Sequence, residues 1–272
     1  MGTIYTRIVR IFDAQIFSMN SWDLKGKRAL VTGGSKGIGK AVVREFLLLG
    51  AEVLFTARNA QDVAATEQEL SQLGYPVHGH VANVSVDGDR QKLLEWIREH
   101  WGSLDILVNN AGINIHKKSI DYSEEEYMQI LGIDLLSPFE LCRVLLPMLQ
   151  QGNGPSIINL SSVAGSYDLQ TGAPYGMAKA GVIQLSRNLA VEWARHKIRV
   201  NTVSPWFTST PLVEGVLEDP KRFEAITSKT PLRRVAQPAE IAAAVAFLAM
   251  DKSSYITGHN LSVDGGVTCR LL

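Results

Sequence analysis

The stretch that decides the fold is Arg28-Ala-Leu-Val-Thr-Gly-Gly-Ser-Lys-Gly-Ile-Gly39, where an apolar strand turns into a helix. Glycines stand at positions 33, 37 and 39 of this turn. Such glycines permit a tight turn and let the backbone approach a pyrophosphate, while the following helix N-terminus offers amide donors and a positive dipole. A dinucleotide-binding loop is therefore predicted, with a ligand-free strand-to-helix turn as the simpler alternative.

Outward from this turn, the chain alternates apolar strands with helical patterns. Helices are predicted over Ala41 to Leu49, Val63 to Leu73 and Tyr175 to about His196. Besides Arg28 to Thr32, strands are predicted at Glu52 to Thr56, Val77 to Val81, Leu104 to Val108, Ser156 to Leu160, Ile198 to Val203 and Asn260 to Val263. Strands separated by helices form parallel sheets that are covered on both faces, so we predict a single-domain, doubly wound α/β fold.

Composition excludes several classes of protein. The chain has 272 residues, 46% of them hydrophobic, and a formal net charge of zero, which suits one large core and argues against a nucleic-acid or membrane-surface partner. Cys142 and Cys269 have neither metal-ligand nor CxxC spacing, so we expect a reducing, cytoplasmic compartment and no metal site. Residues 1–21 are predicted to be an extension of no assigned function, without the apolar core of a signal peptide. Residues 22–272 then form the domain, in which the weakly periodic segment 205–233 is expected to be a mobile lid over the substrate.

Two observations narrow the predicted ligand. Gly34 to Lys40 also fits the triphosphate motif G-x-x-x-x-G-K, but Ala41 stands where a Ser or Thr would hold magnesium, so a dinucleotide is favoured over ATP. A cofactor whose ribose carries only hydroxyls usually contacts an acidic residue at the end of the second strand. Here the strand ends in Arg58 without a carboxylate, and Lys36 lies in the glycine loop, so we predict NADPH or NADP+ as cofactor rather than NADH. Two solvated surface charges are the alternative.

A candidate catalytic pair is Tyr175 and Lys179, four residues apart on one predicted helical face. The ammonium would lower the pKa of the tyrosine, and a shift from about 10 to about 7 corresponds to roughly 4 kcal/mol. Ser162 follows a predicted buried strand and could hydrogen-bond a carbonyl oxygen as charge develops on it. A surface lysine beside a packing tyrosine is the alternative for the isolated motif.

Together these motifs resemble the short-chain dehydrogenase/reductase family over Leu24 to Gly266. The matches are TGxxxGxG at Thr32 to Gly39, NNAG at Asn109 to Gly112, Ser162, and YxxxK at Tyr175 to Lys179. The resemblance implies a Rossmann fold with a seven-stranded sheet, a dimer or tetramer, and hydride transfer between nicotinamide and a carbonyl carbon. Tyr175 would donate the proton, Ser162 would orient the carbonyl, and Lys179 would bind the nicotinamide ribose and tune the tyrosine.

Four further stretches resemble the tropinone reductases of plants and their bacterial relatives: Gly112-Ile-Asn-Ile-His-Lys117, Ala190 to Ala194, Ile198 to Asn201 and Ser254 to Gly258. This similarity implies a ketone substrate and places His116 beside it. Trp206, after Pro205, replaces a common glycine of the family. Its indole would narrow the substrate pocket, or would fold into the lid without touching substrate.

The predicted sites follow from these resemblances. Ser162, Tyr175, His116 and Trp206 are expected to contact substrate. The residues expected to contact the cofactor are Gly33, Ser35, Lys36, Gly37, Ile38, Gly39, Arg58, Asn83, Val84, Asn110, Ala111, Gly112, Tyr175, Lys179, Pro205, Thr208 and Thr210.

One departure bears on catalysis. Asp134 stands where most members carry a catalytic asparagine, so it joins the predicted catalytic set. Its carboxylate either pairs with Lys179 and perturbs the proton path, or only accepts backbone hydrogen bonds.

Taken together, the motifs favour an NADPH-dependent, tropinone-reductase-like reduction of a small ketone, and physiological alcohol oxidation is a second possibility. A nucleotide-binding protein that has lost catalysis is the alternative from another class.

Overall fold

The computed structural model describes residues 22–270, so the predicted extension at residues 1–21 lies outside the described residues. Over the described range, seven parallel strands form one sheet in the order β3-β2-β1-β4-β5-β6-β7. The strands are β1 (Arg28–Thr32), β2 (Glu52–Ala57), β3 (Val77–Val81), β4 (Ile106–Asn109), β5 (Ser156–Leu160), β6 (Arg199–Pro205) and β7 (Asn260–Val263). The predicted doubly wound fold is confirmed. The strand order reverses between β1 and β4, and in such sheets ligands bind at the carboxyl ends beside this reversal.

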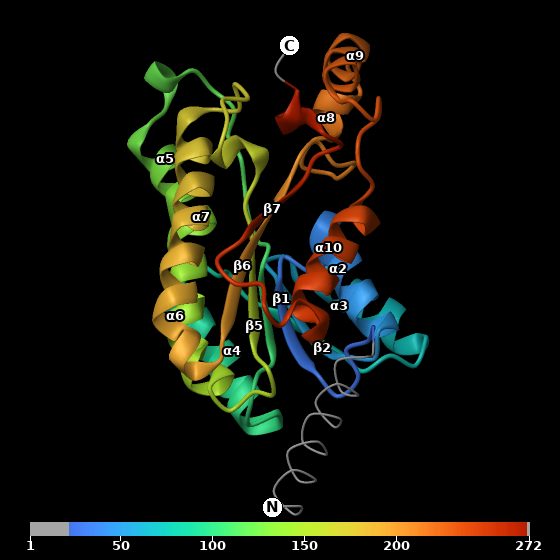
Figure 1. Cartoon of the computed structure of the whole chain (residues 1–272), viewed down its shortest axis with the longest axis vertical. Helices are drawn as coiled ribbons and strands as arrows, with labels where there is room; N and C mark the ends of the chain where they lie inside the picture. Colours follow the sequence, from blue (N-terminus) through green and yellow to red (C-terminus); the bar gives the residue numbers. More distant parts are fainter. Residues whose placement is uncertain (1–21, 271–272) are drawn as a thin grey trace, which may run out of the picture.

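Helices cover both faces of the sheet (Figure 1). One layer contains α2 (Gly37–Leu48), α3 (Ala60–Gln72) and α10 (Pro238–Ala249), and the other contains α4 (Asp87–His100), α6 (Ser137–Leu149) and α7 (Ala173–Trp193). Helix α5 (Glu124–Leu131) packs on α7, and the π-helical turn η2 (Gly132–Leu136) joins it to α6. The remaining short helices are η1 (Ser119–Asp121), η3 (Val163–Gly165), η4 (Ala194–His196), α8 (Glu214–Leu217), α9 (Pro220–Lys229), η5 (Asp251–Ser253) and η6 (Val267–Cys269).

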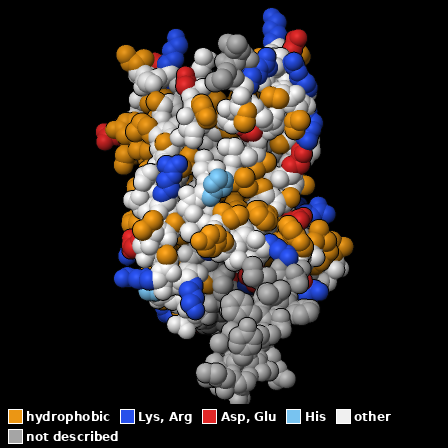
Figure 2. Space-filling model, in the orientation of Figure 1, with side chains coloured by type: hydrophobic (Ala, Val, Ile, Leu, Met, Phe, Trp, Pro, Cys, Tyr) orange, Lys and Arg blue, Asp and Glu red, His pale blue; other side chains and the backbone are white. Residues whose placement is uncertain are grey.

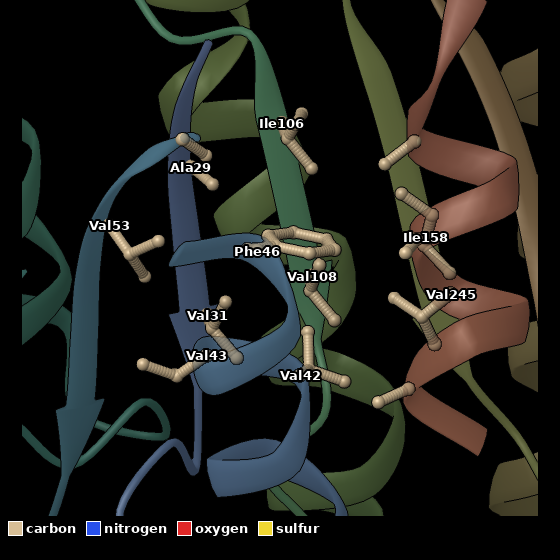
Figure 3. Close-up of a cluster of buried hydrophobic side chains, with 14 of the residues drawn as sticks. Ala29, Val31, Val42, Val43, Phe46, Val53, Ile106, Val108, Ile158 and Val245 are labelled. Carbon is tan, nitrogen blue, oxygen red and sulfur yellow. The ribbon is translucent and has the colours of Figure 1, made fainter. Parts of the chain in front are cut away.

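Alternating side chains of the central strands divide between two cores. Val31 of β1 packs in the cluster beneath α2 and α10, together with the fully buried Phe46 and Val245 (Figure 3). The neighbouring residue Leu30 points to the opposite face, into the cluster beneath α4 and α6. Burial on both faces explains why the strands are apolar runs rather than alternating sequences. Truncating Phe46 to alanine in such a core would cost about 3–5 kcal/mol.

Several predicted boundaries were wrong, for local reasons. Helix α2 begins at Gly37 and not at Ala41, because the second half of the glycine loop already forms the first helical turn. Helix α3 begins at Ala60 and not at Val63, since the Asn59 side chain accepts the Asp62 N–H and caps the helix. The strand predicted from Leu104 to Val108 begins at Ile106 and ends at Asn109.

The weakly periodic segment 205–233, which was predicted to be a lid, contains the helices α8 and α9 after the end of β6. In Figure 1 these helices lie at the top of the molecule. No helix between residues 22 and 270 is both long enough and apolar enough to span a bilayer.

Candidate active site

A cavity of about 590 Å³ lies at the carboxyl ends of β1, β2 and β4. Eight residues that the sequence predicts to contact the cofactor line it: Gly33, Ser35, Lys36, Arg58, Asn83, Val84, Ala111 and Gly112. The glycine loop, the end of β2, the segment after β3 and the segment after β4 therefore share one cavity. This is the place where the strand order of the sheet reverses.

The start of α2 is suited to an anion. Its N-cap residue Lys36 makes no side-chain capping bond, and the first turn contains no acidic residue. The first amide groups of the helix are therefore open to a ligand, and the helix dipole favours a negative charge there. Gly39 allows the close packing of this turn, because a Cβ at that position would collide with the Gly33 carbonyl oxygen.

The cavity also contains a carboxylate that sequence reasoning missed. Lys36 Nζ lies 2.8 Å from Asp62 Oδ2, and Asp62 lines the cavity with Arg58 and Asn59. The expectation of no acidic residue holds for the end of β2 but not for the cavity as a whole. The missed signal was Asn59: as the N-cap of α3, it places Asp62 in the first helical turn beside the end of β2.

Part of the predicted NNAG motif after β4 holds the glycine loop in place. The Asn110 side chain donates to the carbonyl oxygens of Thr32 (2.8 Å) and Gly33 (3.2 Å), and so holds the glycine loop against β4. Asn109 is buried and donates to Asn159 Oδ1 at 2.8 Å. Neither side chain is among the residues that line the cavity, whereas Ala111, which follows them, is.

The candidate catalytic residues gather at the carboxyl end of β5. Helix α7 begins at Ala173, so the half-buried Tyr175 and the buried Lys179 share its first two turns. Lys179 Nζ lies 5.5 Å from the centre of the Tyr175 ring. Ser162 caps η3, where its Oγ accepts the Ala164 N–H. Ser161 Oγ donates to the Lys179 carbonyl oxygen at 2.8 Å and ties α7 to the end of β5.

The carboxylate of Asp134 lies beside this lysine. Asp134 is fully buried in η2, and its Oδ2 is 3.0 Å from Lys179 Nζ. Its Oδ1 accepts the Ile113 N–H at 2.8 Å. Lys179 Nζ also donates to the Leu160 carbonyl oxygen at 3.2 Å. An ammonium has three donors, so one remains for another partner once Asp134 and Leu160 are served.

These contacts correct the expected pKa of Tyr175. Burial raises this pKa most strongly; the Lys179 charge and a hydrogen bond from Ser162 lower it, and the Asp134 charge raises it again. The net pKa is raised, whereas the spacing of Tyr175 and Lys179 alone predicted a lowered one. Desolvation lowers the pKa of Lys179, but Asp134 and Tyr175 outweigh it, and the net pKa is raised, so the ammonium form is retained.

The other two residues predicted to contact substrate, His116 and Trp206, do not line the cavity at the carboxyl ends of β1, β2 and β4. His116 is exposed, and its Nε2 donates to the Gln170 carbonyl oxygen at 2.7 Å. Trp206 Nε1 donates to Thr230 Oγ1 at 3.0 Å, within the segment 205–233, so its indole is held by that segment. Contact of either side chain with substrate stays a prediction.

The predicted cofactor contacts after β6 follow one another along the chain. Pro205 ends β6, and Thr208 Oγ1 donates to the Trp206 carbonyl oxygen at 3.0 Å. Thr210 packs over the glycine loop, since a Cβ on Gly37 would lie 3.3 Å from its side chain. Ile38 packs against the core beneath α2.

Known proteins resemble the chain along most of its length. A family model described as enoyl-(acyl carrier protein) reductase matches residues 33–268. A tropinone reductase homolog from Arabidopsis thaliana is 45% identical over 248 residues, which cover 91% of this chain and 94% of the relative. The solved structure of a short-chain type dehydrogenase/reductase from Mycobacterium marinum is 33% identical with a TM-score of 0.86, and covers 92% of this chain and 98% of its own. A gluconate 5-dehydrogenase from Burkholderia cenocepacia, solved with NADP and tartrate, is 28% identical with a TM-score of 0.88. The match covers 93% of this chain and 99% of the dehydrogenase chain.

Proposed function

Because the chain belongs to the short-chain dehydrogenase/reductase family, we propose that it reduces a ketone to a secondary alcohol with NADPH. The observation that carries this proposal is the convergence of Tyr175, Lys179 and Ser162 beside a cavity suited to a dinucleotide. A proton donor, a hydrogen-bond donor for the carbonyl oxygen and a cofactor site are the three components that carbonyl reduction needs.

Members of this family bind nicotinamide cofactors, and the cavity fits one. The open first turn of α2 suits the pyrophosphate, and Lys36 and Arg58 offer charge to a ribose 2′-phosphate. The structural neighbour gluconate 5-dehydrogenase was solved with NADP, which supports the choice of the phosphorylated cofactor. When bound, the cofactor would supply the hydride that reduces the carbonyl carbon.

The side chains of the chain would handle the proton. The Tyr175 hydroxyl donates a proton to the carbonyl oxygen as negative charge develops there, and Ser162 hydrogen-bonds the same oxygen. General acid catalysis of this kind typically contributes about 10²–10⁴-fold. Lys179 holds its positive charge near the tyrosine and keeps one donor for the nicotinamide ribose.

The substrate is proposed to be a small ketone, since the relative from Arabidopsis thaliana is a tropinone reductase homolog. His116 and Trp206 would flank it, and the segment 205–233 would close over it as a lid. The indole of Trp206 is already fastened to Thr230 in this segment, so lid movement would carry the indole along.

The test is turnover by the purified protein. NADPH oxidation is followed with a panel of bicyclic and aromatic ketones, for the native protein and for Tyr175→Phe. The variant keeps the ring but loses the hydroxyl, so we expect turnover to fall at least about 100-fold with NADPH affinity nearly unchanged. Native-like turnover in Tyr175→Phe would remove this residue from the mechanism.

A second candidate function is nucleotide binding without catalysis. The contact between Asp134 and Lys179 favours it, because the family's usual neutral asparagine would leave the lysine charge unopposed. NADPH binding without turnover of any ketone or alcohol would support this function over the reductase.

We also propose a homo-oligomer, either a dimer or a tetramer. Support comes from exposed apolar side chains on α5, η2, α6 and α7, among them Met128, Leu136, Phe139, Met177 and Val191. These helices lie together on one side of the sheet (Figure 1).

A further inference from the structure

The positive charge beside Tyr175 is balanced by a negative charge. Lys179 is the cation nearest the ring, and the carboxylate of Asp134 pairs with it at 3.0 Å. The side chains of both partners are almost completely buried, at 6% and 0% exposure. Charges interact more strongly in such a low-dielectric setting than at a surface. Tyr175 therefore senses a buried ion pair instead of an isolated ammonium.

Asp134 is held in this position. Its Oδ1 accepts the Ile113 N–H, and a Cβ on Gly112 would lie 3.2 Å from its Oδ2, so the carboxylate is enclosed by the backbone after β4. On the other side, the π-helical turn η2 packs against α7. The carboxylate thus has no solvent side to which it could turn away from Lys179.

Other charged groups on the elements packed against α7 have different partners or lie at its surface. Arg199 of β6 donates to Leu248 O and Ser253 Oγ at the opposite end of that strand. On α5, Glu126 pairs with Lys117. Glu124 and Glu125 of α5 are exposed, η3 and β5 carry no charge, and Arg195 and His196 of η4 contact each other. The exposed His116 donates to Gln170 O.

We propose that Asp134 sets the pH range of alcohol oxidation: by compensating the Lys179 charge it keeps the Tyr175 hydroxyl protonated at neutral pH, so oxidation, which needs the phenolate, requires a more alkaline pH. This inference rests on the proposed function. In it, Asp134 is a positioning residue that acts through Lys179 and Tyr175.

The two directions need opposite forms of Tyr175. In reduction, the carbonyl carbon accepts a hydride and its oxygen accepts the Tyr175 proton, and the resulting phenolate takes a proton from water. In oxidation, the phenolate must be present first to remove the alcohol proton, while the cofactor accepts the hydride. Burial and Asp134 raise the pKa of Tyr175 against the opposing effects of Lys179 and Ser162. Each unit by which that pKa exceeds the pH lowers the phenolate fraction about tenfold.

The kinetic test compares the native protein with Asp134→Asn in both directions across neutral and alkaline pH. We expect the midpoint of the oxidation profile to fall by about one unit in the variant. Oxidation at neutral pH should then rise about tenfold. The matched control is Asp251→Asn, which removes a carboxylate paired with Lys27, away from the candidate active site. An unchanged oxidation midpoint in Asp134→Asn would overturn the inference.

A second measurement does not depend on turnover. The phenolate absorbance of the protein without cofactor is titrated for the native chain and for Tyr175→Phe, and their difference isolates Tyr175. We expect a native midpoint above the ordinary value of about 10, and a lower one when the same difference is taken in the Asp134→Asn background. A native midpoint near neutrality overturns the inference even if Asp134→Asn does not fold.

The two proposals can fail separately. Absence of turnover in both directions would defeat the reductase and the claim about the pH range of oxidation together, while the titration would still decide whether Asp134 controls Tyr175. An oxidation rate of the native enzyme that is already maximal at neutral pH would defeat the claim about the pH range alone.

Discussion

Two cations and one carboxylate line the cavity that we propose as the cofactor site, and the balance between them depends on single side chains. Lys36 is paired with Asp62 at 2.8 Å, whereas Arg58 is exposed on the same wall. A 2′-phosphate would have to compete with Asp62 for Lys36, but would meet Arg58 without that competition. Arg58 should therefore contribute more to the choice of cofactor than Lys36 does.

Arg58→Ala and Asp62→Asn should change cofactor choice in opposite directions. Loss of Arg58 removes a charge-assisted partner, worth about 1–3 kcal/mol, so NADPH affinity should fall about 5- to 150-fold. Asp62→Asn releases Lys36 from an exposed pair worth about 0.2–1 kcal/mol, so NADPH affinity should rise by up to about fivefold. Fluorescence titration with NADPH checks both, with NADH as the matched control because it lacks the phosphate. Equal weakening of both cofactors in Arg58→Ala would contradict this assignment.

The sequence predicted some of these residues better than others. Tyr175 and Lys179 were predicted to meet because helical spacing alone decides their proximity. Asp62 escaped prediction, since its place depends on the capping of α3 by Asn59. The raised pKa of Tyr175 was also not predictable, because its largest cause is burial, which helical spacing does not show.

At the level of structural elements, two loops beside α7 are fastened to each other. Asn114 Nδ2 donates to Thr171 O at 3.1 Å, and His116 Nε2 donates to Gln170 O at 2.7 Å. The loop that leaves β4 is thereby joined to the loop that leads into α7. A groove of about 760 Å³ lies along this junction. The loops thus form one wall near Tyr175, and loosening them should affect substrate more than cofactor.

Asn114→Ala removes the Thr171 contact and should raise the KM for the ketone severalfold, since a lost hydrogen bond is worth about 0.5–1.5 kcal/mol. The Kd for NADPH should stay within about twofold of the native value, because Asn114 does not line the cofactor cavity. Steady-state kinetics and cofactor titration measure the two effects. Asn188→Ala is the control, since Asn188 accepts a hydrogen bond from Gln184 on the exposed side of α7. A shift in the NADPH Kd equal to that in KM would refute a role confined to the substrate side.

Among the structural elements, the positions of the strands could be predicted from the sequence, whereas the π-helical turn η2 could not. The strand segments predicted between helical patterns located all seven strands to within two residues at either end. The π-helical turn at Gly132–Leu136 has no distinct periodicity in sequence. That turn nevertheless positions Asp134 beside Lys179, so the contact required the structure.

Across the whole molecule, α5, η2, α6 and α7 expose apolar side chains away from the sheet. Met128, Leu136 and Phe139 are 49%, 49% and 40% exposed, and Met177 and Val191 are 60% and 82% exposed. Hydrophobic side chains gather over α5 in Figure 2. Scattered exposed apolar residues are normal, but a group spread over adjacent helices often marks an interface. The alternation of strands and helices predicted the fold, but only the family resemblance predicted an oligomer.

If a second copy of the chain covers this face, the double variant Met177→Glu/Val191→Glu should weaken assembly. Two carboxylates would enter an apolar contact, and burying an unpaired charge costs several kcal/mol. Light scattering coupled to size-exclusion chromatography should give a dimer or tetramer for the native protein and a smaller species for the variant. Leu73→Glu is the control, because Leu73 is 62% exposed next to α3, in the helical layer on the opposite face of the sheet. A native monomer, or a double variant that assembles like the control while keeping the native melting temperature, would rule this face out as the interface.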